Sequence, residues 1–238
     1  MSTFQYVDKE LDIFAHTRNW KRYWSSQVVQ FIAGDVLEAG AGIGANTAMI
    51  KAAAGPVCSW TALEPDPEFA DSLKKTPSVD PATAKCIPRI GTIQSFGATP
   101  QFNSLLYIDV LEHIEQDREE MERAAALLRP GGHIVVLLPA YQWLYTPFDE
   151  ATGHFRRYSK ATLKACSPSS CRLVTLRYLD SVGMLASAAN RFLLLQQSQP
   201  KLRQILLGDR WLVPPSRFVD RLLFHSVGKS VLAVWRKP

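Results

Sequence analysis

Short apolar runs alternate along this chain with segments whose apolar residues recur at helical spacing. The apolar runs predict strands at 35–39, 57–63, 104–108, 133–138, 171–178 and 229–235, with a poorly marked strand near 83–87. The helical spacing predicts helices at 18–33, 44–54, 67–75, 116–129 and 159–166. Strands that alternate with helices in this way indicate an α/β fold, in which helices cover both faces of a mostly parallel sheet.

The segment 180–227 departs from this alternation. It contains the helical patterns Met184–Leu195 and Leu202–Leu207, which a polar break at Gln196–Pro200 separates. A basic amphipathic helix, Ser216–Phe224, follows. An insert of this length with a helical pattern is usually functional or forms an interface. Three interpretations stay open, in order of preference: a lid over a hydrophobic acceptor, a homodimer surface, and a peripheral contact with a membrane or lipid.

The helix predicted at 18–33 is rich in aromatic residues. Its apolar positions Trp20, Trp24, Val28 and Phe31 recur at helical spacing and define one face. Packing against the core is favoured over a second interpretation, in which the helix covers a ligand site.

Composition sets broad limits. The 238 residues, 47% hydrophobic and 21% charged, predict a single globular domain. Within it we expect an N-terminal helix (18–33), a core (34–178), the helical insert (180–227) and a last strand (228–236). No apolar run reaches the length of a membrane span, and residues 1–10 have no apolar signal core, so the expected location is cytoplasmic. We expect the four cysteines to be mostly buried, free thiols.

The net charge is +5, and much of the excess lies late in the chain. A basic balance suits nucleic acid, an anionic membrane surface or a phosphorylated substrate. A solvated basic surface is slightly favoured over a dedicated anion site.

The most informative motif is a glycine turn that follows the first strand. Its pattern is E-x-G-x-G-x-G, formed by Glu38, Gly40, Gly42 and Gly44. Such a turn lets the backbone approach a ligand, and the N–H groups of the following helix point into it. An acid before the first glycine disfavours a pyrophosphate but suits a cationic ligand with an ammonium and a sulfonium. Glu64, which ends the second strand, is at the usual position for a carboxylate that binds ribose hydroxyls.

From these residues onward the chain resembles the class I S-adenosylmethionine-dependent methyltransferases, and within them the type 11/12 enzymes that act on small molecules. Phe102–Ile114 resembles the fourth strand of that family and its turn, and Leu127–Pro139 resembles the next helix–turn–strand element, with Pro-Gly-Gly as a tight reversal. A G-H-x-R-R-Y segment within Phe148–Ser159 resembles a signature of one bacterial branch. The resemblance implies a Rossmann-like, doubly wound sheet of seven strands, whose last strand is antiparallel.

The resemblance also implies the cofactor and its residues. The cofactor is S-adenosyl-L-methionine, the product is S-adenosyl-L-homocysteine, and no metal is expected. The implied cofactor-binding residues are Glu38, Gly40, Gly42, Gly44, Asn46, Glu64, Pro65, Gly91, Thr92, Asp109, Val110 and Leu111.

Candidates for catalysis lie beyond the fourth and fifth strands. His154 is the leading candidate for a general base, because a histidine titrates near neutral pH. Asp109 and His113 are weaker candidates. Substrate binding is expected from the residues around His154, namely Asp149, Arg156, Arg157 and Tyr158. In the alternative interpretation these side chains form an ion-pair network that fixes the loop.

The predicted function is methyl transfer to a small-molecule acceptor, a hydroxyl of a partly hydrophobic metabolite. No N/D-P-P-Y/F/W run follows the fourth strand, so a flipped nucleic-acid base is not expected as the substrate. The alternatives are a lipid-linked saccharide, a carbon centre in secondary metabolism, and a scaffold that keeps the fold without turnover. An NAD-linked oxidoreductase is disfavoured by Glu38 and by the glycine spacing.

Overall fold

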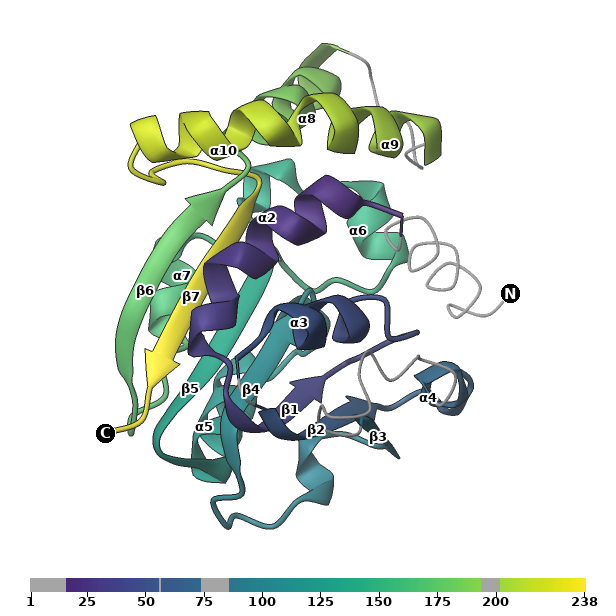
Figure 1. Cartoon of the computed structure of the whole chain (residues 1–238). Helices are drawn as coiled ribbons and strands as arrows, with labels where there is room; N and C mark the ends of the chain where they lie inside the picture. Colours follow the sequence, from purple (N-terminus) through teal and green to yellow (C-terminus); the bar gives the residue numbers. More distant parts are fainter. Residues whose placement is uncertain (1–15, 56, 74–85, 194–201) are drawn as a thin grey trace.

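The computed structural model describes residues 16–55, 57–73, 86–193 and 202–238. Its centre is a seven-stranded sheet of order β3-β2-β1-β4-β5-β7-β6 (Figure 1). β7 is antiparallel to both β5 and β6, and the other neighbours are parallel. The predicted fold class is therefore confirmed. The strands are β1 Gly34–Ala39, β2 Val57–Glu64, β3 Cys86–Ile90, β4 Phe102–Ile108, β5 Leu128–Pro139, β6 Arg172–Leu179 and β7 Ser230–Arg236.

Helices cover both faces of the sheet, because successive strand residues point to opposite sides. In β4, Leu105 and Tyr107 belong to one buried cluster, whereas Leu106 and Ile108 belong to the other. α2 and α3 cross the front face in Figure 1, and α5 and α7 lie behind it. The helices are α2 Arg18–Val28, α3 Thr47–Ala53, α4 Pro67–Leu73, α5 Asp117–Leu127, α6 Pro147–Ala151, α7 Lys160–Ala165, α8 Ser181–Leu193, α9 Leu202–Trp211 and α10 Val213–Leu222.

Several boundaries differ from the sequence prediction. α3 begins at Thr47 rather than at residue 44, because Gly44 has a φ of +80° and cannot take part in a right-handed helix. The predicted helix end at 74–75 lies outside the described residues. The segment predicted as a loop after β5 contains a 3₁₀ turn, Gln142–Leu144, and then α6.

The Pro-Gly-Gly segment is part of a strand rather than a tight reversal. β5 begins at Leu128, and its pairing with β4 shifts between the Phe102–Leu128 and Ser104–His133 pairs, so residues 129–132 bulge. Gly131, at φ +80°, donates its N–H to the Lys237 carbonyl at 2.9 Å, which ties the bulge to the end of β7.

The solvent exposure of the cysteines differs from the sequence prediction. Cys166 is buried, but Cys58 is exposed and Cys86 and Cys171 are half-buried, and all four are free. The cysteines are therefore not mostly buried.

The predicted aromatic helix packs on the core. Tyr23, Trp24 and Val28 of α2 are buried against the face of the sheet that also carries α3. A 3₁₀ turn, Val29–Phe31, then leads into β1.

The described part of the insert forms a layer that contains the helices α8, α9 and α10, at the end of the sheet where β6 stops (Figure 1). Buried carboxylates attach it to the rest of the molecule. Asp220 accepts hydrogen bonds from the Tyr23 hydroxyl at 2.7 Å and from the N–H groups of Asp180 and Ser181 at 2.7 and 2.9 Å. The predicted polar break at Gln196–Pro200 lies outside the described residues. In the part of the chain that the structure describes, no helix combines the length and apolar character that crossing a bilayer requires.

Candidate active site

The glycine turn after β1 has the backbone that its sequence predicts. Gly40, Gly42 and Gly44 all have positive φ, at +62°, +54° and +80°, a region that side chains with a Cβ rarely adopt. A Cβ on Gly40 would lie 2.6 Å from Cγ2 of Val110. The turn after β1 therefore touches the turn after β4, and this contact requires glycine.

Glu64, at the end of β2, holds the glycine turn. Its carboxylate accepts the Gly42 N–H at 2.8 Å and the Asp66 N–H at 3.1 Å, and its side chain is buried. Burial raises its pKa, which these two hydrogen bonds oppose. A carboxylate offers about four acceptor positions, so Glu64 retains capacity for ribose hydroxyls.

Glu38 ties three elements together. One carboxylate oxygen accepts the Thr47 hydroxyl of α3 at 2.7 Å and the Trp60 indole N–H of β2 at 2.9 Å. Burial is the main influence on its pKa and raises it to about 7, against the effect of these two hydrogen bonds. These contacts position the glycine turn. A direct contact between Glu38 and a methionine moiety stays a prediction.

The remaining residues expected at a cofactor surround this turn. The N–H of Gly91, which has a φ of +132°, donates to the Glu64 carbonyl at 3.0 Å, so the turn after β3, with Thr92, lies next to Glu64 and Pro65. Asn46 precedes α3 without a side-chain cap bond. Leu111 is fully buried beneath the turn after β4.

Asp109 begins the turn after β4 with a φ of +55°. Its side chain reaches solvent, yet the protein around it desolvates the carboxyl group, and this burial raises its pKa to about 6. Electrostatic interactions with His154, Lys229, Arg157 and Lys21 oppose that rise. Asp109 therefore interacts electrostatically with residues of α2, of the loop after α6 and of the segment just before β7.

Lys21 is a site residue that the sequence analysis missed. It lies on α2, is buried, and donates from Nζ to the Ala45 carbonyl of the glycine loop at 3.4 Å. Burial lowers its pKa to about 8, and Asp109 opposes the shift. The sequence did contain one signal for this residue, because Lys21 stands next to the apolar face of a predicted amphipathic helix.

His154 and Asp149 form a hydrogen-bonded pair. His154 Nδ1 lies 3.1 Å from Asp149 Oδ1, and both side chains are buried. The Tyr145 hydroxyl donates to the His154 carbonyl at 2.6 Å, which fixes the backbone of the loop. With Nδ1 engaged by a carboxylate, Nε2 is the nitrogen left to accept a proton.

Asp149 accepts further hydrogen bonds. Arg157 donates from Nε and Nη2 at 2.8 and 2.9 Å, and Thr146 donates from its N–H and hydroxyl at 2.7 Å each. Burial alone would raise the pKa of Asp149, but the His154 hydrogen bond, the Arg157 charge and the Thr146 bonds together lower it to about 2. Asp149 is therefore a carboxylate at any physiological pH.

Arg156 and Tyr158 face a different acid. Arg156 Nη1 lies 2.7 Å from Asp117 Oδ2, and the buried Tyr158 hydroxyl donates to the same oxygen at 2.8 Å. In the G-H-x-R-R-Y segment, His154 and Arg157 therefore contact Asp149, whereas Arg156 and Tyr158 contact Asp117. The expected substrate-binding set does not form one cluster.

His113 adjoins His154. Their rings meet edge to face with centroids 4.5 Å apart. The His113 side chain reaches solvent, yet the protein around it desolvates the ring, and this lowers its pKa to about 4. The electrostatic interaction with His154 lowers it further, and hydrogen bonds to the Gly153 and Thr152 backbone oppose the shift. At neutral pH His113 is therefore uncharged, with one ring nitrogen that can accept a hydrogen bond and one that can donate.

One group among the described residues has the composition of a metal site. Glu112, His113 and His154 each offer a ligand atom, and these atoms lie within 4.8 Å of one another. No spacing in the sequence indicated this group, because its histidines come from different loops. The sequence prediction of no metal stays a prediction.

The chain is similar to known methyltransferases in part of its sequence and in its fold. Residues 37–134 match the family model described as a methyltransferase domain. No curated protein matches the chain. Among solved structures, the N-methyltransferase NodS from Bradyrhizobium japonicum WM9, in complex with S-adenosyl-L-homocysteine, is 15% identical with a TM-score of 0.60, and 100% of each chain is covered.

Two further structures set the limits of this likeness. A chain from the complex between the Haloferax volcanii Trm112 methyltransferase activator and a methyltransferase is 13% identical with a TM-score of 0.68, covering 100% of this chain and 98% of that one. The [4+2]-cyclase SpnF is 13% identical with a TM-score of 0.59, covering 92% and 80%. At such identities the likeness concerns the fold alone, and a cyclase among the neighbours means that the fold does not specify the reaction.

Proposed function

We propose that this chain, which has the class I methyltransferase fold and carries a methyltransferase domain, binds S-adenosyl-L-methionine and transfers its methyl group to a hydroxyl of a small, partly hydrophobic acceptor. The observation that carries the proposal is the glycine turn, with Gly40 against Val110 and the Gly42 N–H on the Glu64 carboxylate.

The same hydrogen bond argues against a dinucleotide. A pyrophosphate needs the N–H groups of such a turn and an adjacent positive field. Here the Gly42 N–H is already bonded to the Glu64 carboxylate, and the turn after β4, which begins at Asp109, touches the glycine turn through Val110. This arrangement favours a ligand with positive charge and ribose hydroxyls. When bound, S-adenosyl-L-methionine supplies a methyl group already activated by its sulfonium.

On the acceptor side, the Asp149–His154 pair supports acid–base chemistry. Asp149 holds the His154 ring through Nδ1, so His154 Nε2 is the atom that takes the proton of an acceptor hydroxyl. With S-adenosyl-L-methionine held at the glycine turn, its sulfonium would supply the methyl group and the leaving thioether, and the acceptor oxygen that His154 deprotonates would be the nucleophile. His154 ends the step protonated, beside a carboxylate that stabilises the charge.

Three alternatives share this site. The acceptor can be a lipid-linked saccharide, because the positive charges of Lys21, Arg157 and Lys229 near Asp109 suit its phosphate groups, or it can be a carbon centre. Glu112, His113 and His154 can instead hold a divalent cation that activates the hydroxyl. A scaffold without turnover is the third, and intact Glu64 and glycine residues argue against it.

Calorimetric titration tests the cofactor. We expect S-adenosyl-L-methionine and S-adenosyl-L-homocysteine to bind with micromolar affinity, and NAD not to bind. Glu64→Ala removes the ribose acceptor, whereas Glu64→Gln keeps one carbonyl acceptor for the Gly42 N–H and serves as the matched control for folding of the turn. Binding of NAD instead, or of neither sulfonium ligand nor product, contradicts the proposal.

Turnover is tested with radiolabelled methyl donor and a panel of hydroxylated aromatics, lipids and sugars. Each reaction is run with and without a chelator. Unchanged turnover after chelation supports His154 as the base, and turnover that chelation abolishes and a divalent cation restores supports the metal alternative. Binding of the donor without turnover on any acceptor supports the scaffold.

A further inference from the structure

α9 and α10 form one nearly continuous rod. Leu212 between them keeps a helical backbone, with φ −96° and ψ −35°. Its N–H donates to the Gly208 carbonyl at 2.8 Å, and its carbonyl accepts the Ser216 N–H at 3.2 Å, so helical hydrogen bonds cross the junction. Pro214 and Pro215 at the start of α10 need no such donor. The residues of both helices can therefore be compared on one set of faces.

The inner face of this rod carries its acids. Asp209 is buried and accepts the N–H groups of Asn19 and Trp20 at 3.0 and 2.8 Å, and Asp220 is buried under the Tyr23 hydroxyl. These are the acidic residues between Leu202 and Phe224. No carboxylate is therefore left on the outer face of the rod.

The outer face is apolar along its length. Trp211, Phe218 and Leu222 recur at helical spacing, and their side chains are 64%, 66% and 61% exposed. Leu207, one turn before Trp211, continues the same stripe, and Phe224 after the helix is 88% exposed. Single exposed apolar residues are ordinary, but a stripe along two helices indicates a surface that another body covers.

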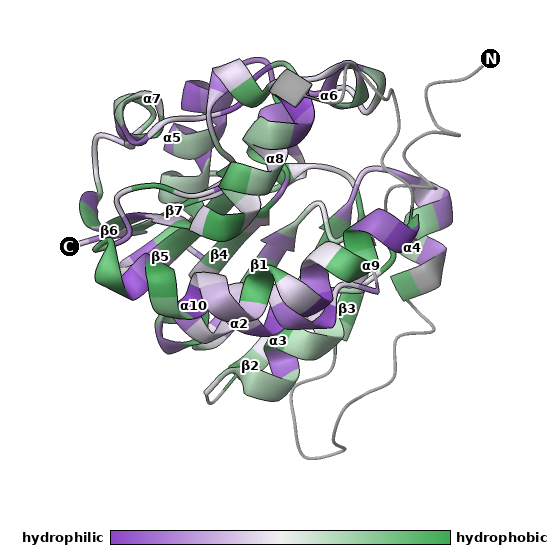
Figure 2. Ribbon diagram, turned by 90° about the horizontal axis from the view of Figure 1, so that it is seen from above, coloured by the Kyte–Doolittle hydropathy of each residue, from purple (hydrophilic) through white to green (hydrophobic). Residues whose placement is uncertain are grey.

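Arginines follow one flank of this stripe. Arg203, Arg210 and Arg217 recur at intervals of two helical turns, and Arg221 lies one turn after Arg217. All four side chains are exposed. Figure 2 shows the resulting alternation of hydrophilic and hydrophobic residues along α9 and α10. Aromatic and leucine side chains beside arginines are the composition of a helix that lies in the interface of an anionic bilayer.

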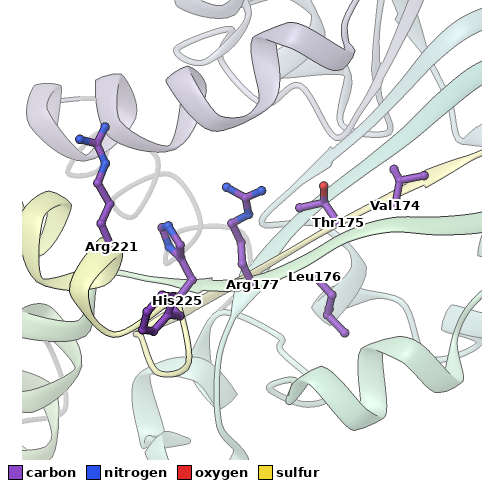
Figure 3. Close-up of a pocket in the computed structure, with 7 residues that line it drawn as sticks. Val174, Thr175, Leu176, Arg177, Arg221 and His225 are labelled. Atoms are coloured by element: carbon purple, nitrogen blue, oxygen red, sulfur yellow. The ribbon is translucent and has the colours of Figure 1, made fainter.

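A shallow cavity of about 440 Å³ adjoins the end of α10. Arg221, Phe224 and His225 line it together with Arg177 of β6, and it shares no residue with the candidate active site. Figure 3 shows Arg177, Arg221 and His225 pointing to the same side. Two guanidinium groups beside an exposed phenylalanine suit a lipid phosphate whose acyl chains follow the apolar stripe.

We propose that the outer face of α9 and α10 binds the surface of an anionic phospholipid bilayer. Trp211, Phe218 and Leu222 enter the interface, and the arginines contact lipid phosphates. The proposal does not depend on the methyltransferase assignment, because it concerns a different face of the molecule. A second copy of this chain is a poorer partner, since the outer face offers no carboxylate to pair with the arginines of the other copy.

The test is co-sedimentation of the full chain with vesicles of phosphatidylcholine alone or mixed with phosphatidylglycerol. We expect tight binding to the mixed vesicles, much weaker binding to the neutral ones, and release by salt. Arg203→Gln, Arg210→Gln and Arg217→Gln combined should weaken binding about 100-fold, on the basis of about 1 kcal/mol per arginine near a charged surface. Phe218→Ser with Leu222→Ser should weaken it at least about tenfold.

Two control variants carry the same chemical changes elsewhere. Arg118→Gln, Arg123→Gln and Arg172→Gln remove three exposed arginines from α5 and β6, and Ile87→Ser with Ile90→Ser removes two exposed apolar side chains from β3. Neither should change vesicle binding. Titration with S-adenosyl-L-homocysteine on every variant separates this surface from the cofactor site.

Several results would overturn the proposal. They are absence of binding to mixed vesicles, equal binding to neutral ones, or equal loss in the control variants. A dimer of the unmodified chain in solution that Phe218→Ser dissociates would assign the face to a second copy. If a variant fails to fold, the salt and lipid dependence of the unmodified chain still decides the matter.

Discussion

The two sides of the candidate active site are assembled in different ways. On the cofactor side, Glu38, Gly42, Thr47, Trp60 and Glu64 are joined by hydrogen bonds within one β–α–β unit. On the proposed acceptor side, Asp109 interacts electrostatically with Lys21, His154, Arg157 and Lys229, which come from α2, from the loop after α6 and from the segment just before β7. The cofactor side can therefore form from local structure, whereas the acceptor side exists only when the whole sheet and its helices are packed.

Substitutions in the Asp149–His154 pair should have the largest effect on turnover. His154→Gln and Asp149→Asn should each lower kcat about 10²- to 10⁴-fold, the range for loss of a general base or of its orientation. The Kd for S-adenosyl-L-homocysteine should stay unchanged, because the pair belongs to the proposed acceptor side. Steady-state kinetics and calorimetry measure the two quantities.

A matched carboxylate is available as the control. Asp117→Asn breaks the second acid–arginine pair of the same segment, at Arg156, without touching His154. We expect its kcat to stay within a few-fold of the unmodified value. Equal losses in Asp117→Asn and Asp149→Asn would mean that both acids only fix the loop, which is the ion-pair interpretation.

Gly40→Ala should have the next largest effect, and on the cofactor side alone. The substitution places a Cβ at φ +62° and 2.6 Å from Val110. Left-handed strain of about 1–2 kcal/mol together with overpacking predicts at least about 100-fold weaker binding of S-adenosyl-L-homocysteine. Gly97→Ala is the control, because an added Cβ there meets nothing within 4 Å. Comparable losses in both variants would refute the role of the turn.

Glu38→Gln should change stability with pH. The folded-state pKa of Glu38 is raised to about 7 from 4.5, so its contribution to stability is greatest below pH 4.5 and is lost as pH rises to 7. Glutamine cannot ionise and keeps an acceptor for Thr47 and Trp60. We expect the variant to be more stable at pH 8 by on the order of 3 kcal/mol, with little difference at pH 4.5, in urea unfolding. A difference independent of pH would contradict this.

The smallest effects should separate the two faces of α10. Tyr23→Phe removes the 2.7 Å bond to buried Asp220 and should cost about 1–2 kcal/mol of unfolding free energy. Phe218→Ser, on the exposed face, should stay within about 0.5 kcal/mol. Thermal unfolding of both variants measures this. A large loss in Phe218→Ser would show that the stripe packs within the molecule.

Much of the fold could be predicted from the sequence, because it follows from local patterns. The alternation of apolar runs and helical segments predicted the strands and the parallel sheet, and the resemblance to class I methyltransferases is confirmed by the family match and the fold. The misassigned boundaries were those set by backbone geometry. Gly44 delays α3, and the bulge around Gly131 extends β5 past the expected reversal.

The candidate site divides in the same way. The positions of Glu38, Glu64 and the glycines follow from dihedral angles and hydrogen bonds within one β–α–β unit, which neighbouring residues determine. The pairing of Asp149 with His154 and Arg157, the separate pairing of Asp117 with Arg156, and the approach of Lys21 to the glycine loop were decided by the tertiary structure. Such contacts depend on which loop ends and helix faces the packing brings together, and no spacing along the chain records that. The tertiary structure also decided which face of α9 and α10 is exposed. Asp209 and Asp220 are buried against α2, and the apolar stripe therefore faces outward.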